Sequence, residues 1–400
     1  MTSSSQTPLC IVEVNDAKDI SAAIKIIGST KTPFAKYKMV NVAKDKKTAE
    51  IGLGSTFTEV YQALNGTGVI VLGARADGPG TGGVTLSSGY SWHTNQYGLG
   101  FDTVVSYEVV LPDGRIVTAS DSSEPELFFA LNGGLNRFGI VTKIVFKTVP
   151  QPGKIYGGLQ FFSSADVPTV IAATEKFHLN SQDPKASVVL TIGGGTLPGA
   201  ILISFYDGET RPSDFDVFKG INSTFSTLAT QDYSSMIAGS LTAFQAGNRG
   251  SFASISTKTL TKKFMEAVFN ETQHWSQFTK TRSGGVMQYD VEPFHAYGKY
   301  ATDLAYPHAD SPLPLNIYFS WTKVEDDVFW NDAIQKSLAR LRCVAREEGI
   351  FVGGSMYPGY AYRTTTGEQL YGKTNAVKLR GIRKKYDPNG VMLLAGGFTI

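Results

Sequence analysis

Cysteine and histidine are scarce in this chain of 400 residues, and neither occurs in a metal-binding pattern. The two cysteines, Cys10 and Cys343, are too few for a disulfide framework and lack metal-ligand spacing. None of the five histidines lies four residues from another, the spacing by which two histidines on one helix bind zinc. We therefore expect no metal site.

Long hydrophobic runs and a large excess of one charge are also missing. The first residues lack the basic start and apolar run of a signal peptide, and no apolar segment is long enough to span a bilayer. The formal net charge is only +2, whereas proteins that bind nucleic acid or membrane surfaces usually carry a strong basic excess. As it stands, the sequence predicts a cytoplasmic protein that binds small molecules, without nucleic-acid or membrane partners.

Glycine, in contrast, is abundant and concentrated. Residues 78–91 hold five glycines, two threonines and three serines, which leave the backbone nearly free of bulky side chains. Glycine allows backbone N–H groups to approach a ligand, and hydroxyl groups add small donors. This stretch therefore predicts a site for a phosphate-bearing cofactor, with a flexible linker as the alternative interpretation.

Within that stretch, residues 78–83 match the pattern G-x-G-x-x-G, and Asp102 follows where a ribose-binding acid is expected. The dinucleotide fingerprint must open a helix inside a βαβ unit. Here residues 84–90 are a poor sequence for a long helix, and Asp113-Gly114 predicts a β-hairpin soon afterwards. A Walker A lysine and a G-x-S-x-G nucleophile motif are also missing. The context therefore argues against a Rossmann fold, a P-loop and a serine hydrolase.

Two prolines and a glycine within residues 150–153 predict a domain boundary. Beyond it, strand-forming segments at 187–192, 201–206 and 315–321 predict an antiparallel meander. Helical spacing is found at 167–179, 262–278 and 325–348, and Gly349 is expected to cap the last of these helices. The sequence before this boundary thus differs from the sequence after it, which is predicted to form antiparallel strands and longer helices.

Two helices carry specific expectations. Ser55 is expected to cap a helix with the inner face Phe57, Val60, Tyr61 and Leu64. The helix over 325–348 is expected to bury Val328, Ile334, Leu338, Leu341 and Ala345.

Tyr357 and Tyr360 lie in a predicted turn after a strand. A phenol there can polarise or deprotonate a substrate hydroxyl if its environment favours the anion. The alternative is a pair of core tyrosines whose hydroxyl groups are hydrogen-bonded.

Several blocks of sequence, four of them specific and in the same order, resemble one family. They resemble fungal FAD-linked oxidoreductases, the berberine-bridge-like enzymes of the vanillyl-alcohol-oxidase superfamily. The blocks are Gly-Gly-Val-Thr-Leu-Ser-Ser-Gly-Tyr-Ser-Trp at 82–92, Tyr-Gly-Leu-Gly-Phe-Asp-Thr-Val-Val at 97–105, Glu-Val-Val-Leu-Pro-Asp-Gly at 108–114, Asn-Arg-Phe-Gly-Ile-Val-Thr at 136–142 and Lys-Tyr-Asp-Pro at 385–388. The resemblance covers nearly the whole chain.

The resemblance implies an α+β fold with a PCMH-type FAD-binding domain over residues 1–150. A substrate domain, an antiparallel sheet backed by helices, would follow over 151–365, and residues 366–400 would return to the FAD domain. The implied reaction moves a hydride from a small organic substrate to flavin, with dioxygen as electron acceptor, in fungal secondary metabolism. Relatives of this type are often secreted.

The resemblance also implies site residues. Tyr357 and Tyr360 would be the acid–base residues. The cofactor-binding residues would be Gly80, Thr81, Gly82, Gly83, Thr85, Ser87, Gly89, Tyr90, Ser91, Gly139, Ile140, Val141 and Thr142.

This sequence departs from the family pattern in several places. After Lys31-Thr-Pro-Phe-Ala35 the usual Gly-Gly-Gly-His loop is missing, as is a leading segment, so we expect any FAD to be bound non-covalently. Ser87-Ser88 stands where relatives commonly have glycines, and Gly359 replaces an asparagine. One alternative is a flavin-free pseudoenzyme, metabolite-binding protein or cyclase on the same scaffold. Another is a shortened gene product.

Overall fold

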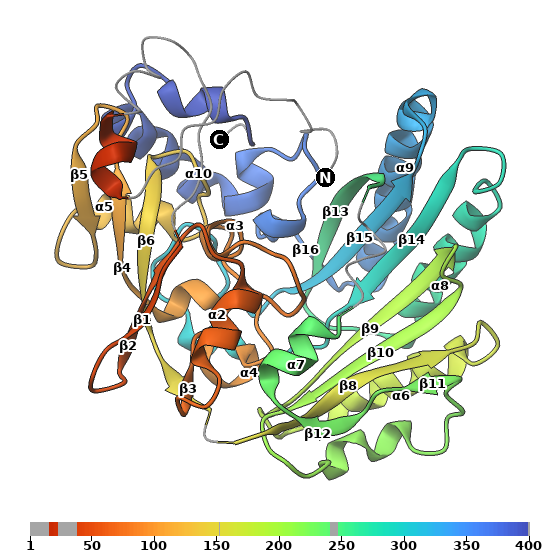
Figure 1. Ribbon diagram of the computed structural model, residues 1–400. Helices are drawn as coiled ribbons and strands as arrows, with labels where there is room; N and C mark the ends of the chain where they lie inside the picture. The colour runs from red at the N-terminus through yellow and green to blue at the C-terminus, as the bar shows by residue number, and fades with distance from the viewer. Residues whose placement is uncertain (1–15, 23–37, 152, 241–246, 399–400) are drawn as a thin grey trace. The chain divides into compact units, whose positions relative to one another are not determined.

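The computed structural model describes residues 16–22, 38–151, 153–240 and 247–398 (Figure 1). The predicted strand over residues 9–14 lies outside these ranges. Two compact units are formed, and we name them by their place in the chain. The central unit is Gly153–Gly298 with Asp310–Tyr362, and the terminal unit is the described part of Gln6–Pro152 with Lys299–Ala309 and the residues from Arg363 onward. Both units combine antiparallel sheet with helices, which is the α+β class that the resemblance implies.

The terminal unit contains a five-stranded sheet in the order β1-β2-β6-β4-β5, antiparallel throughout. Its strands are β1 (Val40–Val42), β2 (Thr48–Gly52), β4 (Val104–Val110), β5 (Ile116–Ala119) and β6 (Ile140–Lys147), and a separate pair joins β3 (Val69–Ile70) to β7 (Val149–Pro150). The predicted hairpin is confirmed: the Leu111 N–H donates to the Arg115 carbonyl at 2.8 Å, and Gly114 has φ 85°. Glycine adopts this backbone conformation without strain.

The helices of the terminal unit are α2 (Phe57–Leu64), α3 (Thr81–Leu86), α4 (Thr94–Tyr97), α5 (Pro125–Leu131) and α10 (Gly367–Tyr386). The inner face predicted for α2 is buried as expected. The prediction that Ser55 caps this helix is wrong, because Thr56 is the N-cap residue. Thr56 Oγ1 accepts from the Glu59 N–H at 3.3 Å, and Glu59 Oε2 accepts from the Thr56 N–H at 2.8 Å. This reciprocal capping box requires a glutamate three residues after the cap, a spacing that only Thr56 has.

The segment Lys299–Ala309 clusters with the terminal unit, although the residues on both sides of it belong to the central unit. His308 Nε2 lies 3.0 Å from the carboxylate of Asp102, and both side chains are buried. The Asn375 side-chain amide of α10 donates to the Ala305 carbonyl at 3.0 Å. Side-chain contacts thus hold this segment against two other parts of the terminal unit.

The central unit contains a nine-stranded antiparallel sheet in the order β11-β8-β10-β9-β14-β15-β13-β16, with β12 also paired to β8. Its strands are β8 (Ile155–Phe162), β9 (Ala186–Gly195), β10 (Gly199–Tyr206), β11 (Phe225–Ser226), β12 (Ala229–Gln231), β13 (Arg249–Thr257), β14 (Gly284–Val291), β15 (Leu313–Trp321) and β16 (Phe351–Val352). Its helices are α6 (Val167–Asn180), α7 (Tyr233–Ala238), α8 (Lys262–Ser276) and α9 (Asp327–Glu347).

Helices α6, α8 and α9 contact strands of this sheet. The side chain of Tyr289 shows which face α9 covers, because its hydroxyl lies 2.7 Å from Ser337 of α9. Successive residues of a strand alternate between faces, so Gln288 and Asp290 lie on the face opposite α9. The sheet therefore has an apolar face under helices and a second face that carries polar side chains.

The predicted buried face of α9 is confirmed with one exception. Ile334, Leu338, Leu341 and Ala345 are buried, but Val328 is 82% exposed. Val328 precedes Ile334 by six residues, which is out of phase with a helix of 3.6 residues per turn. Trp330, four residues before Ile334, is buried in its place.

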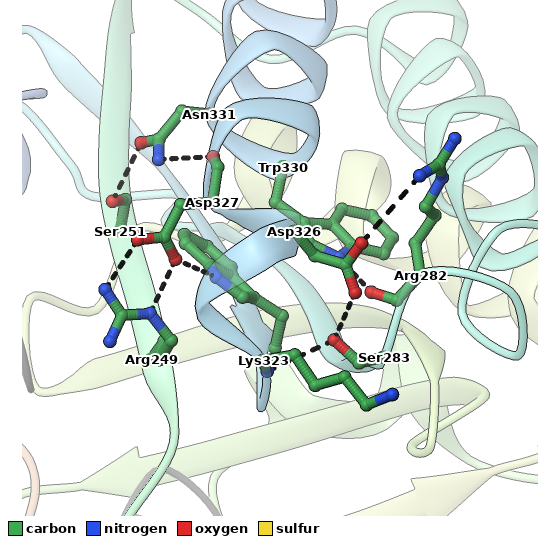
Figure 2. Close-up of polar contacts among 10 residues, drawn as sticks. Arg249, Ser251, Arg282, Ser283, Lys323, Asp326, Asp327, Trp330 and Asn331 are labelled. Atoms are coloured by element: carbon green, nitrogen blue, oxygen red, sulfur yellow. Dashed lines mark hydrogen bonds and ion pairs between the residues drawn. The ribbon is translucent and has the colours of Figure 1, made fainter.

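The start of α9 is fixed by a polar network (Figure 2). Asp327 accepts from Arg249 Nε at 2.5 Å, Arg249 Nη2 at 2.6 Å and Trp321 Nε1 at 2.6 Å. The adjacent Asp326 accepts from the Ser283 hydroxyl at 2.6 Å. Both acids lie at the helix N-terminus, where negative charge is favoured by the helix dipole.

Substitution of Asp327 is expected to destabilise the central unit. In Asp327→Ala, Arg249 and the Trp321 indole lose their shared acceptor, which should cost about 2 kcal/mol of unfolding free energy. Urea unfolding followed by tryptophan fluorescence measures this loss. Glu325→Ala is the matched control because it removes the same charge from an exposed residue of the same turn. Equal midpoints for the two variants would contradict the role of the network.

Candidate functional site

The glycine segment predicted to hold a cofactor lies in the terminal unit, against the start of α2. The Phe57 N–H donates to the Pro79 carbonyl and the Thr81 N–H to the Ser55 carbonyl, each at 3.0 Å. Gly80 is the N-cap of α3, and Thr81, Gly82, Gly83 and Thr85 lie within this six-residue helix. The helix is too short for a Rossmann crossover helix and leads to the β4–β5 hairpin, which agrees with the rejection of the dinucleotide fingerprint.

Three glycines of this segment face open space. A Cβ atom built on Gly78, Gly80 or Gly83 would meet no other atom within 4 Å. Gly82 is different, because a Cβ there would lie 2.8 Å from the Leu53 side chain. Gly78, Gly80 and Gly83 thus leave room for a ligand to approach the backbone closely, as a phosphate requires.

Two hydroxyl groups next to these glycines are buried without a hydrogen-bond partner in the described part of the chain. They are Thr85 Oγ1 and Ser88 Oγ, on side chains of residues that are at most 1% exposed. An unpaired buried hydroxyl is costly, and acceptor atoms of a bound ligand can remove that cost. The bare backbone and the unpaired hydroxyls fit the phosphate and ribityl groups of a flavin dinucleotide.

The backbone after α3 is held in an unusual conformation. Ser88 has φ 104° and Gly89 has φ 74°. The carbonyls of these two residues accept from the Phe101 N–H at 3.0 Å and the Gly100 N–H at 2.7 Å. A positive φ is unfavourable for serine, so these hydrogen bonds maintain Ser88 in a strained conformation.

The second predicted segment, residues 139–142, begins β6. A Cβ on Gly139 would lie 2.8 Å from the Val110 carbonyl oxygen, so this position excludes a side chain. Ile140 and Val141 pair with β4 in the sheet, and the Thr142 hydroxyl donates to Glu108 Oε1 at 2.6 Å. These residues are therefore held by the hydrogen bonds between β6 and β4.

The loop before β6 connects the two predicted segments. The Leu135 N–H donates to the carbonyl of Leu86, the last residue of α3, at 3.1 Å. The remaining predicted residues follow α3 directly: Ser87 donates to the Val84 carbonyl, Tyr90 is buried, and the Ser91 N–H donates to Thr94 Oγ1 at 2.9 Å. The structure thus joins the glycine helix to the loop that leads into residues 139–142.

The tyrosines predicted as acid–base residues lie in the central unit, on a 3-10 turn at Pro358–Tyr360. The Tyr360 hydroxyl donates to Glu292 Oε1 at 3.0 Å. The ring of Tyr357 contacts that of Tyr360 edge to face, with centroids 4.7 Å apart. A Cβ on Gly359 would lie 2.6 Å from the Tyr357 ring, so the ring in this position favours glycine over a residue with a side chain.

Sequence reasoning missed the carboxylates Asp290 and Glu292 near the end of β14. Glu292 is 1% exposed. Asp290 accepts from Thr191 Oγ1 at 2.6 Å, Asn316 Nδ2 at 2.8 Å and Gln288 Nε2 at 2.8 Å. A signal was available, because two acids lie two residues apart at the end of a predominantly apolar segment, where burial requires hydrogen-bond partners.

The described part of the chain contains neither a metal-ion cluster nor a membrane-spanning helix. Within residues 16–22, 38–151, 153–240 and 247–398, no group of three His, Cys, Asp or Glu side chains is arranged to hold a metal ion. No helix in those same ranges is both long and apolar enough to cross a membrane.

Replacement of the strained serine is expected to stabilise the ligand-free protein. Ser88→Gly relieves the positive φ and removes an unpaired buried hydroxyl, while glycine adds backbone entropy to the unfolded chain. We expect a net gain of about 1 kcal/mol in unfolding free energy, measured by urea unfolding without flavin.

Ser88→Ala separates the two contributions. Alanine removes the hydroxyl and keeps the unfavourable φ, so Ser88→Ala should be less stable than Ser88→Gly. A glycine variant less stable than the alanine variant would show that the conformation of residue 88 is not strained.

Comparison with known proteins identifies the terminal unit's ligand. A family described as an FAD binding domain matches residues 35–120. An FAD-linked oxidoreductase of Arthroderma benhamiae is 30% identical over 301 residues, and the match covers 68% of this chain and 60% of that protein. The bifunctional solanapyrone synthase of Alternaria solani is 27% identical, with 99% of this chain and 82% of the synthase covered.

A solved structure shares the fold. Superposition on 6-hydroxy-D-nicotine oxidase from Arthrobacter nicotinovorans gives a TM-score of 0.80 at 17% identity, covering 97% of this chain and 91% of the oxidase. Identity this low shows the fold alone. The family match therefore shows an FAD binding domain in this chain, whose cofactor is FAD, and the two relatives and the shared fold show that the chain is similar to FAD-linked oxidoreductases.

Proposed function

We propose that this protein is an oxidase-type enzyme that removes a hydride from a small organic alcohol, amine or activated carbon, within fungal secondary metabolism. The observation that carries the proposal is the hydrogen bond from the Tyr360 hydroxyl to the buried carboxylate of Glu292. A phenol paired with a carboxylate can take part in proton transfer during oxidation of a hydroxyl group. The solanapyrone synthase relative supports the assignment to secondary metabolism.

The proton path follows from this pair. Glu292 Oε1 lies 3.0 Å from the Tyr360 oxygen and can receive the phenolic proton. The Tyr360 oxygen then accepts the proton of the substrate hydroxyl. Asp290 is a poor candidate for this step because three side chains already donate to its carboxylate. We assign Tyr360 as the general base, Glu292 as its proton acceptor, and Tyr357 as the ring that orients Tyr360.

FAD, when bound, supplies the acceptor for the hydride, and dioxygen is the proposed final electron acceptor. The residues proposed to hold it are the predicted set in residues 80–91 and 139–142. Thr85 contributes its unpaired hydroxyl, and Gly80 and Gly83 contribute open backbone. Attachment is proposed to be non-covalent, because the sequence lacks the family's histidine loop.

The absorbance spectrum of purified protein tests cofactor binding. We expect flavin bands after incubation with FAD, a higher melting temperature, and release of all flavin into the supernatant on acid precipitation. Colourless protein with no gain in melting temperature would contradict the proposal and favour a non-redox protein on this scaffold. Flavin retained in the precipitate would contradict non-covalent attachment.

Removal of the Tyr360 hydroxyl tests the proton path. For an alcohol that reduces the bound flavin, Tyr360→Phe should lower the anaerobic rate of flavin reduction by about 10²–10⁴-fold without loss of FAD. Tyr362→Phe is the matched control, since it removes a hydroxyl that bonds to Asn331 Oδ1 in the same region of chain. If both variants reduce flavin at the wild-type rate, Tyr360 is not the base.

A further inference from the structure

A buried arginine in the terminal unit has donors that no described residue accepts. Arg137 lies in the loop between α5 and β6 and is only 4% exposed. Its Nε and Nη2 atoms are buried without a hydrogen-bond partner in the described part of the chain. Arginine almost never loses its proton in proteins, so a buried guanidinium without an acceptor retains an uncompensated charge.

Among the described residues, the groups that act on Arg137 do not include a carboxylate. Burial lowers the pKa of Arg137, and the charge of Arg383 lowers it further, while Tyr371 acts in the opposite direction. Tyr371 is itself buried, which raises the pKa of its phenol, and its hydroxyl donates to the Gly133 carbonyl at 3.0 Å. A neutral phenol engaged in this way supplies no negative charge. The described groups around Arg137 therefore leave its positive charge without a counter-ion.

The position of Arg137 in the chain indicates which anion this is. Two residues earlier, Leu135 bonds through its N–H to Leu86 at the end of the glycine helix. That helix and the turn after it carry two further unpaired buried donors, the hydroxyls of Thr85 and Ser88. Unsatisfied donors thus occur on two segments that a backbone hydrogen bond joins. Such a set suits a ligand with several anionic acceptor atoms.

We propose that Arg137 is the counter-ion of the FAD diphosphate. This inference rests on the proposed function and goes beyond it, because it assigns a charged cofactor-binding residue that the glycine pattern does not contain. The planar guanidinium can donate to two phosphate oxygens at once, whereas the glycine loop supplies only neutral donors. Arg137 gives the site its selectivity for a flavin that carries phosphate over one that does not.

Binding of FAD and of riboflavin by the purified apoprotein tests this assignment. The two ligands share the isoalloxazine ring and ribityl chain, but only FAD carries the diphosphate. Flavin fluorescence titrations should show that Arg137→Met weakens FAD binding at least tenfold, which corresponds to about 1.4 kcal/mol, and changes riboflavin binding less than twofold. Arg137→Lys keeps the positive charge but loses the planar guanidinium that donates two hydrogen bonds at once. Its FAD affinity should therefore lie between those of the wild type and Arg137→Met.

Arg380→Met is the matched control, since it removes an exposed cation of α10 and should leave FAD binding unchanged. The melting temperature of the apoprotein should not fall in Arg137→Met, because the substitution removes an unpaired buried charge. Inorganic pyrophosphate should compete with FAD for the wild type and much less for Arg137→Met.

The opposite results would overturn the assignment. Equal losses of FAD and riboflavin affinity, or a lower melting temperature of apo Arg137→Met, would show that Arg137 has a structural partner within the chain. Unchanged FAD affinity in Arg137→Met would also overturn it, while leaving the proposed function intact. If the wild-type protein binds neither FAD nor riboflavin, the result would instead contradict the proposed function itself.

Discussion

Close approach between backbone segments is the constraint on which the terminal unit depends. A Cβ on Gly100 would lie 3.2 Å from the Gly89 carbonyl oxygen and 3.3 Å from that of Leu72. Gly139 is similarly close to the Val110 carbonyl. At these points the chain packs backbone against backbone, so hydrogen bonds rather than side chains determine the path of the glycine segment. The same arrangement leaves open space beside the backbone at Gly80 and Gly83, where we propose that the cofactor binds.

The central unit is subject to a different constraint, because it contains buried carboxylates in and beside its sheet. Phe319 and Trp330 pack edge to face on the side that α9 covers. Asp290 lies on the other side, where side-chain donors from β9, β14 and β15 satisfy it. A buried carboxylate is tolerated only when it is hydrogen-bonded, so these neighbours are as necessary as the acid. Just beyond the end of β14, Glu292 accepts a hydrogen bond from the Tyr360 hydroxyl at 3.0 Å.

Much of the fold could be predicted from sequence because its signals are local. The Asp113-Gly114 turn, the inner face of α2 and the glycine cap at Gly349 depend on spacing within a few residues, and the last is seen as a φ of 67°. The family resemblance supplied the α+β class and the cofactor. Other features depend on contacts between distant residues. Thr56 replaces Ser55 as the cap because of Glu59, and Trp330 rather than Val328 fits the helical phase of α9.

The site was predictable only in part for the same reason. The glycines and hydroxyls in residues 78–91 predict a phosphate ligand from composition alone. The burial of Arg137, in contrast, can be recognised only from the residues that surround it in the structure. The contact between Glu292 and Tyr360 joins residues 68 positions apart in sequence. The sequence shows the two acids Asp290 and Glu292 but not which side chains donate to each of them. That distinction requires the cross-strand register of β9, β14 and β15.

The segment Lys299–Ala309 has a consequence for how the protein is synthesised. It contacts Asp102 through His308 and α10 through Asn375, yet it interrupts the chain of the central unit. Neither unit is a continuous length of polypeptide, so a ribosome cannot complete one before it begins the other. The strands of the terminal unit's sheet all precede the central unit, whereas α10 is synthesised after it, so the terminal unit is complete only when nearly the whole chain has emerged. Contacts between residues so far apart in sequence slow folding, so we expect the docking of α10 to be a late step in the folding of the terminal unit.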